Sequence, residues 1–528
     1  MDIIKLQQFL FNGIPRRADL VGYEAQNLQE SFKVALYRNH SFEFVENTIC
    51  PYLDYAQLSV EFIYSDYDDS LSFAQFDASA DLLLLWLDFS RYQIKNIDGF
   101  LHERLLALRT FYKKNILIIP FNHETLALSM TGVHVFDLLD VRMQMKESYL
   151  DEAREVFSGT KMSARTCMEV SKRLGLLYLP AFLKPPIKAV VVDLDNTLYK
   201  GILGEDGVQG ISPDSDYLVF QNLLQKIKNS GIFLCVASKN ELSDVKLLFE
   251  KRDDFILKWE DFAKVCASWG TKASAIREIA ALLNIHEESI LFIDDNIGEL
   301  ISASAELSGL KIIYAENPVI STKVLSSFPG LTRFFRNNED ELRNSDIKAN
   351  IKRSELKTTM SVGDYIKSIH MCLTLRANEM ENIARISELA NKTNQFIFSY
   401  KRYTPSEIES LMADASYMVV SLHLKDDLSD SGLIGACVFK NMANYVLLEE
   451  LYISCRALGR GVDKIMIYAA IELGLHKLGK DKLKVNFISG ERNAPAKAFI
   501  ENYLAGHLCE PDFIYSEKQD YLTITAEE

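Results

Sequence analysis

A short apolar run that ends in two closely spaced aspartates is the feature that most constrains this chain. The stretch AVVVDLDNTLYKGILGEDG covers residues 189–207, and its first four residues lead directly to Asp193 and Asp195. β-Branched valines followed by acids predict a buried strand with charge at its carboxyl end. Alternate side chains of an extended backbone share a face, so we expect both carboxylates to point into one pocket. Two carboxylates held together repel, and a divalent cation is the usual means of holding them.

Size and composition limit what can surround this stretch. The 528 residues are enough for roughly three domains, and 48% of them are apolar. The formal charge of −15 argues against a basic face for nucleic acid. The eight cysteines are scattered without a C-x-x-C pair, and we find no export signal and no apolar run of membrane-spanning length. We therefore expect a cytoplasmic protein with free thiols and with no nucleic-acid or membrane partner.

The first segment, residues 1–184, alternates strand-like and helix-like stretches, which predicts a parallel α/β sheet. The expected strands are 18–21, 62–64, 82–87 and 116–120, and a helix is expected at 27–36. Two consecutive prolines, Pro185 and Pro186, then end the pattern and indicate a domain boundary.

The second segment, residues 185–345, predicts another α/β sheet. The expected strands are Ala189–Val192, 233–237, 291–293 and Lys311–Tyr314, and the expected helices are 217–229, 242–250 and 273–283. Polar residues follow the strands or precede a helix, and the carboxyl ends of parallel strands converge on one crevice. The residues that we expect there are Asp193, Asp195, Thr197, Ser238, Asn240, Lys272, Asp294 and Asp295. Carboxylates, a hydroxyl and a lysine together suit phosphoryl transfer through an aspartyl-phosphate.

The D-x-D-x-T pattern at Asp193 and the FIDDN stretch at Asp295 resemble the haloacid dehalogenase (HAD) superfamily, and more narrowly its FkbH-like HAD-IIIC branch. The resemblance implies a Rossmannoid sheet, with Asp193 as nucleophile and Asp195 as general acid/base that also offers its backbone carbonyl to Mg²⁺. It implies phosphate contacts from Thr197, Ser238, Asn240 and Lys272, a catalytic role for Lys272, and metal binding by Asp193, Asp195, Asp294 and Asp295. The simpler alternative, solvated acids at strand ends, does not explain four motifs in order, namely Asp193 with Asp195, then Ser238, then Lys272, then Asp294 with Asp295.

The intervals after Thr197 and Ser238 are short, so the cap domains that the superfamily inserts there have no room. We expect the cap to be minimal, with residues 201–210 forming at most a hairpin flap. An open site of this kind admits a bulky substrate, including a group carried on a protein.

The third segment, residues 346–528, predicts a connector helix within 337–357 and an α+β domain with antiparallel strands at 417–424, 432–440 and 445–453. Its R-x-x-G-x-G motif resembles the acyl-CoA loop of GCN5-related (GNAT) N-acetyltransferases. The resemblance implies that CoA or phosphopantetheine is held by Arg456, Gly459, Arg460, Gly461 and Asn493. Ile500 stands where many such enzymes have a general-acid tyrosine, and Glu449 and Glu450 are either bases or structural residues.

By its position before this HAD–GNAT pair, the first segment resembles the SGNH-hydrolase-like domain of the same branch. No serine follows its first expected strand in DLVGYEAQNL, and His134 is not part of a D-x-x-H motif. We therefore expect the domain to be catalytically silent, with His123 and His134 as structural residues.

Taken together, the resemblances imply a Mg²⁺-dependent enzyme that dephosphorylates a small acyl substrate of the glyceryl-phosphate type, coupled to acyl transfer to an acyl carrier protein or CoA. Ala237 stands where polyketide members of the branch have a cysteine, so Cys235 is either an acyl nucleophile or a core residue. Two alternatives stay open. One is a GNAT-type acyltransferase with a vestigial HAD domain, acting in polyketide or surface-glycan biosynthesis. The other is a scaffold that docks a carrier through the basic segment 476–484.

Overall fold

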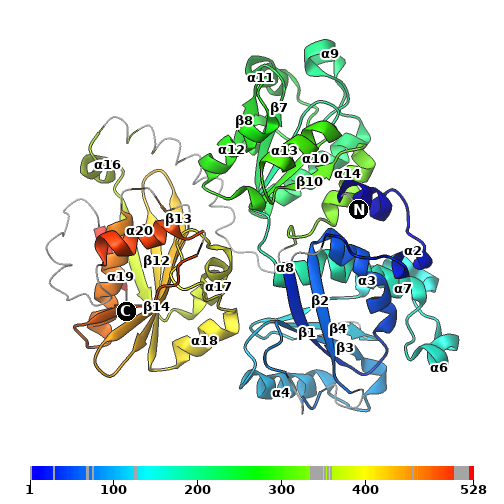
Figure 1. The fold of residues 1–528 in the computed structure, drawn as a ribbon, viewed down its shortest axis with the longest axis horizontal. Coiled ribbons are helices and arrows are strands. Elements are labelled where there is room, and N and C mark those ends of the chain that lie inside the picture. The colour runs from blue at the N-terminus through cyan, green and yellow to red at the C-terminus, as the bar shows by residue number, and fades with distance from the viewer. Residues whose placement is uncertain are drawn as a thin grey trace.

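The computed structural model of the chain contains three β-sheets, each with its own helices (Figure 1). We call the parts around them the N-terminal unit (residues 17–183), the central unit (189–326) and the C-terminal unit (362–527). The structure describes residues 3–27, 30–66, 71–73, 77–123, 126, 128–332, 349, 353, 356, 360–454, 457–458, 460, 462–490, 492–504 and 523–527.

The N-terminal unit is a parallel sheet with strand order β2-β1-β3-β4-β5. Its strands are β1 (Glu30–Arg38), β2 (Leu58–Tyr64), β3 (Leu82–Asp88), β4 (Ile116–Phe121) and β5 (Val133–Val135). All residues of β3 and β4 are buried, as expected for strands covered on both faces. The helices are α2 (Arg17–Val21), α3 (Glu43–Tyr55), α4 (Ile97–Arg109), α5 (Leu139–Met145), α6 (Glu155–Ser158), α7 (Ala164–Arg173) and α8 (Leu179–Leu183), with a π-helical turn at Leu174–Tyr178 between α7 and α8.

Two predictions for the start of this unit are wrong. Residues 18–21 were expected to be a strand but belong to α2, which buries only Leu20. Residues 27–36 were expected to be a helix, yet β1 begins at Glu30. The first residues of β1 are exposed and its last five are buried, so the strand shows no period-two alternation that its sequence could display.

The central unit is a parallel sheet with order β10-β9-β6-β7-β8. The predicted strands are confirmed as β6 (Ala189–Val192), β7 (Phe233–Ser238), β9 (Ile290–Asp294) and β10 (Lys311–Tyr314), and a short edge strand, β8 (Lys264–Ala267), was not predicted. The helices are α9 (Leu203–Gly210), α10 (Ser215–Asn229), α11 (Leu242–Lys251), α12 (Lys272–Leu283), α13 (Ile297–Glu306) and α14 (Pro318–Ser326).

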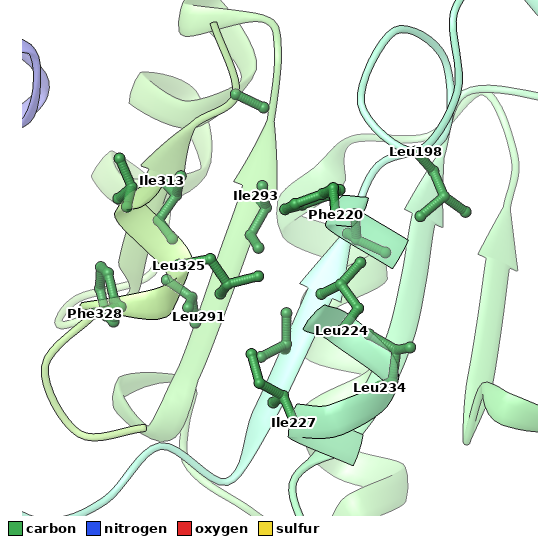
Figure 2. Packing of buried hydrophobic residues seen from close by; sticks show 14 of the residues in the cluster. Leu198, Phe220, Leu224, Ile227, Leu234, Leu291, Ile293, Ile313, Leu325 and Phe328 are labelled. Atoms are coloured by element: carbon green, nitrogen blue, oxygen red, sulfur yellow. The ribbon is translucent and has the colours of Figure 1, made fainter. Parts of the chain in front are cut away.

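Side chains of β6 alternate between two hydrophobic clusters, one on each face of the sheet. Val190 and Val192 belong to the cluster that contains α10 and α14, and Ala189 and Val191 belong to the cluster that contains α12 and α13. Figure 2 shows Phe220, Leu224 and Ile227 of α10 packed over the sheet beside Leu234 and Ile293. The central strand is therefore buried on both sides, which fixes the position of the residues that follow it.

The segment after the first aspartates differs from the predicted hairpin flap. Residues 203–210 form α9, which is kinked at Gly207, where φ is +65°. Only one antiparallel bridge, between Lys200 and Ser212, closes the base of the segment. The flap is thus a short helix whose base is closed by one pair of residues. The prediction that no large cap is inserted here is confirmed.

The C-terminal unit is a mixed sheet with order β15-β14-β13-β12-β11-β16. Its strands are β11 (Cys372–Ala377), β12 (Tyr417–Lys425), β13 (Asp430–Asn441), β14 (Val446–Ile453), β15 (Leu483–Val485) and β16 (Thr523–Glu527). The predicted antiparallel pairing of β12, β13 and β14 is confirmed. The helices are α16 (Val362–Ser368), α17 (Ile383–Lys392), α18 (Pro405–Ala413), α19 (Asp463–Lys477) and α20 (Ala494–Tyr503). Most of the predicted connector helix lies outside the described residues.

The first helix, α1 (Ile3–Phe11), packs against the central unit and not only against its neighbours in sequence (Figure 1). Its Gln7 side chain donates to Tyr314 O (2.8 Å) and accepts from Tyr314 N (3.1 Å) at the end of β10. Arg492 of the C-terminal unit pairs with Glu288 of the central unit at 2.7 Å. Within the described part of the chain, no helix combines the length and the apolar composition that crossing a membrane requires.

Candidate active site

The carboxyl ends of β6 and β9 bring three aspartates together. Asp193 directly follows β6 and its N–H donates to Ile293 O of β9 (2.9 Å), which extends the strand pairing by one residue. Asp294 is the last residue of β9, and Asp295 follows it. One carboxylate oxygen from each of the three lies within 4.8 Å of the other two. Asp193 and Asp294 are buried, and Asp295 is half-buried.

Lys272 inserts its ammonium group between these acids. It is the first residue of α12, and Thr271 caps that helix by accepting from Ser274 N. The Lys272 Nζ atom bonds to Asp193 Oδ1, donates to Ala237 O (2.7 Å) and lies 3.2 Å from Asp294 Oδ2. The side chain is only 5% exposed, so its charge is compensated by the protein and not by solvent.

Burial and mutual repulsion perturb the titration of this cluster. Burial raises the pKa of Asp193 to about 6, an effect that Lys272 opposes and the charge of Asp294 reinforces. Burial, followed by the charge of Asp193, raises the pKa of Asp295 to about 6. Burial also raises the pKa of Asp294. For Lys272, burial opposes the charged form, but attraction to Asp193 and Asp294 outweighs it and raises the pKa.

The cluster contains three carboxylates and one ammonium group, so the negative charge exceeds the positive charge. Carboxylate oxygens at this spacing are the donor set that Mg²⁺ and Ca²⁺ prefer. A divalent cation bound to Asp193, Asp294 and Asp295 would offset the repulsion that raises their pKa values. The residues present therefore fit a hard divalent cation.

The carboxylate of Asp195 is not one of the three that lie within 4.8 Å of one another, and it is held by other partners. Asp195 Oδ1 accepts from Tyr199 OH (2.7 Å) and Leu203 N (3.0 Å), and Oδ2 accepts from Asn240 Nδ2 (2.8 Å). Strand β6 ends at Val192, yet Leu194 still belongs to the hydrophobic cluster of Val190 and Val192. The left-handed turn, at Asn196 with a φ of +53°, comes after Asp195.

Among the other predicted residues, Thr197 is bonded to Asp295 of the acidic cluster, and Asn240 is bonded to Asp195 and Ser238. Thr197 Oγ1 accepts from Asp295 N (3.1 Å), and Asn240 Nδ2 donates to Ser238 Oγ (3.0 Å) as well as to Asp195. All three of these polar side chains are buried. The structure thus places these residues in two sets at the carboxyl edge of the sheet, one around Asp195 and one around the three clustered acids.

Tyr199 belongs to this network, although the sequence patterns assigned it no role. Its ring is fully buried, and burial followed by the charge of Asp195 raises the pKa of its hydroxyl. Tyr199 therefore stays protonated and donates to Asp195. The only signal in the sequence is a tyrosine four residues after the second aspartate.

Cys235 does not face the site. It lies in the middle of β7, is fully buried, and shares a hydrophobic cluster with Ala237. Burial raises the pKa of its thiol to about 12, which disfavours the thiolate that a nucleophile requires. The core alternative for Cys235 therefore holds, and an acyl-nucleophile role does not fit this fold.

The predicted cofactor residues of the C-terminal unit are structural where they are described. Arg460 is buried, donates to Ser431 Oγ (2.8 Å) and lies 3.9 Å from Asp426. Asn493 is fully buried and donates to Ile397 O (3.0 Å) and Ile488 O (2.9 Å). Both side chains thus bond to other parts of the C-terminal unit. Arg456, Gly459 and Gly461 lie outside the described residues.

The two glutamates considered as bases are engaged as well. Glu450 is fully buried and accepts from the backbone N–H groups of Phe398 (2.8 Å), Ser399 (3.0 Å) and Lys401 (2.8 Å). Glu449 pairs with the Lys401 ammonium group at 2.5 Å. A carboxylate that satisfies three backbone donors organises the segment that contains them, so the structural alternative fits Glu450.

The N-terminal unit corrects the reasoning behind its predicted silence. Because the first strand is β1, a serine does follow it, namely Ser41. Ser41 is buried, and its hydroxyl donates to Glu43 Oε2 (2.5 Å). His123 pairs with Asp98 at 2.7 Å, and His134 is buried against the Phe182 ring. These contacts agree with structural roles, and the silence of the unit stays a prediction.

Comparison with known proteins identifies similar folds for parts of the chain. No protein-family model and no curated protein matches it. Among solved structures, the N-terminal part of a Bacteroides fragilis protein, containing a phosphatase domain complexed with Mg, matches 60% of this chain and 98% of its own length, at 19% identity and a TM-score of 0.47. A ribosomal-protein-alanine N-acetyltransferase from Brucella melitensis matches 25% of this chain and 92% of its own, at 13% identity and a TM-score of 0.20. A Vibrio cholerae spermidine N-acetyltransferase variant matches 25% of this chain and 77% of its own, at 20% identity and a TM-score of 0.19. All these TM-scores are below 0.5, so we infer the chemistry of this chain from its own site residues.

Proposed function

We propose that the chain is a Mg²⁺-dependent phosphatase or phosphotransferase of the HAD type, FkbH-like branch, with its active site at the carboxyl edge of the central sheet. The observation that carries this proposal is the meeting of Asp193, Asp294 and Asp295 around Lys272. Three acids around one ammonium group form a site for a cation and a phosphoryl group together. The order of the four motifs along the chain agrees with the same reading.

Asp193 is the proposed nucleophile. Its carboxylate attacks the phosphorus atom of a phosphate monoester, the bond from phosphorus to the leaving oxygen breaks, and an aspartyl-phosphate forms. Lys272 lies against Asp193 and offsets the charge of the incoming phosphoryl oxygens. Bound Mg²⁺, held by Asp193, Asp294 and Asp295, supplies further neutralisation of phosphoryl charge.

Asp195 is the proposed proton donor and acceptor. It gives a proton to the leaving oxygen and then takes one from the water that hydrolyses the aspartyl-phosphate, which releases inorganic phosphate and restores Asp193. Tyr199, Leu203 N and Asn240 hold its carboxylate in place beside the acidic cluster.

The proposed substrate is a phosphorylated small acyl compound of the glyceryl-phosphate type, either free or destined for an acyl carrier protein or CoA. The short helix α9 supports a bulky or carried substrate, because its eight residues leave no room for a large cap.

The test is phosphate release from a panel of phosphate esters and from 1,3-bisphosphoglycerate, with and without Mg²⁺. We expect Mg²⁺-dependent turnover and, by intact mass, a phosphoryl adduct on the wild-type chain that Asp193→Asn lacks. Asp216→Asn is the matched control, because Asp216 is exposed on α10. Turnover that persists in Asp193→Asn contradicts the mechanism.

A further inference from the structure

A pocket of about 380 Å³ lies at the junction of the N-terminal and central units. It is near the start of β10, which begins at Lys311 and ends at Tyr314 beside Asp294. The pocket therefore lies toward the opposite edge of the central sheet from the acidic cluster. Its walls include Tyr55, Gln57, Lys184, Ile187, Lys311 and Phe328.

Lys184, which directly follows the N-terminal unit, and Lys311 of the central unit meet in this pocket at one glutamine. Lys184 Nζ donates to Ala56 O (3.0 Å) and Gln57 O (3.2 Å), and Lys311 Nζ donates to the Gln57 side chain at Oε1 (2.8 Å). Both lysines are half-buried. In the part of the chain that the structure describes, neither ammonium group forms an ion pair with a carboxylate. Glu288, which also lines the pocket, is paired with Arg492.

The environment disfavours both positive charges. Burial, followed by repulsion from Lys311, lowers the pKa of Lys184 to about 8. Burial also lowers the pKa of Lys311, although the charges of Glu288 and Glu30 oppose the shift. Protein interiors normally pair such groups with an acid, because a neutral oxygen offsets only part of the lost hydration.

Capping explains one lysine but not the pair. Ala56 follows the last residue of α3, so Lys184 binds carbonyl oxygens at a helix carboxyl terminus, where a cation is favourable. Lys311 makes no such contact, since its acceptor is the neutral amide of Gln57. A second positive charge beside the first opposes the capping role.

We propose that this junction pocket binds an organic anion that has an apolar body, with Lys184 and Lys311 holding its charged head. A carboxylate or phosphate head would accept hydrogen bonds from the remaining N–H groups of the two lysine side chains beside Gln57. The body would contact Tyr55, Ile187 and Phe328. The volume lies at the lower end of the range for small-molecule pockets, about 300–1,000 Å³, so the ligand is small. Since the walls come from two units, the ligand stabilises their junction.

The test is calorimetric titration with octanoate and with octyl phosphate, without Mg²⁺ so that no turnover occurs. Octanol and inorganic phosphate are the controls that lack the head or the body. We expect at least one of the two anions to bind with a Kd below about 1 mM. We expect Lys184→Met and Lys311→Met each to weaken that binding at least tenfold, while Lys226→Met, at an exposed position of α10, does not. Binding of octanoate alone identifies a carboxylate site, and binding of octyl phosphate alone identifies a phosphate site.

Thermal unfolding separates a ligand-binding role from a structural one. Without ligand, Lys311→Met should unfold at the same temperature as the wild type or higher, because a poorly compensated charge is removed. Lys311→Gln, which can still bond to Gln57, serves if the methionine variant does not fold. The proposal is overturned if neither anion binds, if octanol binds as well as the anions, or if binding survives in both lysine variants.

Discussion

Replacing Lys272 by methionine tests the electrostatic account of the acidic cluster. The substitution keeps the length of the side chain but removes the ammonium group that contacts Asp193, Ala237 O and Asp294. Removing one partner of a buried charge pair costs about 3–5 kcal/mol, because the remaining charges lose their compensation. Lys272 is only 5% exposed, so solvent does not take over its role. We expect the central unit to lose about 3 kcal/mol of stability.

Native-state hydrogen exchange measures this loss in the unit concerned. A loss of about 3 kcal/mol corresponds to more than a hundredfold faster exchange in peptides of β6 and β9, at about 1.4 kcal/mol per factor of ten. Added Mg²⁺ should restore more protection in the variant than in the wild type, because a cation then replaces the missing positive charge. Lys226→Met, at an exposed site on α10, is the control. Unchanged exchange in Lys272→Met without Mg²⁺ would refute the reasoning.

Four further substitutions examine other groups. Asp294→Asn should weaken Mg²⁺ binding by roughly tenfold or more, as measured by calorimetry, because the loss of even an outer partner of a metal site has an effect of that size. Unchanged affinity would exclude Asp294 as a ligand. Glu450→Gln should lower stability by about 2–3 kcal/mol in urea unfolding, since its carboxylate accepts from three backbone donors, whereas Glu449→Gln should change it by less than about 1 kcal/mol. Equal effects of these two would contradict the structural role of Glu450. For His134, burial lowers the pKa to about 4, below the unfolded value of about 6.5. The stability that neutral His134 contributes is therefore fully present above about pH 6.5 and is lost as the pH falls toward 4. Between pH 7 and pH 5 the melting temperature of His134→Leu should therefore fall by less than that of the wild type. Parallel losses would show that His134 is not the group that titrates.

The sequence predicts the central sheet well because its strands are short, apolar and bounded by polar residues. β6 and β10 have the predicted bounds, and β7 and β9 are each longer than predicted by one or two residues. β1 fails because only its carboxyl half is buried, so its first residues look like a solvated helix. β8 is a four-residue edge strand in which only Cys266 is buried, and such a strand has little hydrophobic signal.

The acidic cluster was predictable to the level of residues, but its hydrogen bonds were not. Spacing along strands places Asp193, Asp294 and Asp295 at one edge, because parallel strands end there together. The roles of Tyr199 and Asn240 depend on how two loops fold over each other, which no local pattern encodes. The same limit applies to Arg460, whose side chain donates to Ser431.

The turn after β6 gives two aspartates of one motif different environments. Asn196 adopts a left-handed conformation, which asparagine tolerates better than most residues, and its side chain accepts from Gly201 N (3.0 Å). This turn leaves Asp193 among acids and a lysine, while Asp195 lies among three neutral donors. Two carboxylates in unlike surroundings can take unlike tasks. The proposed mechanism uses this difference, with Asp193 as the nucleophile and Asp195 as the proton carrier.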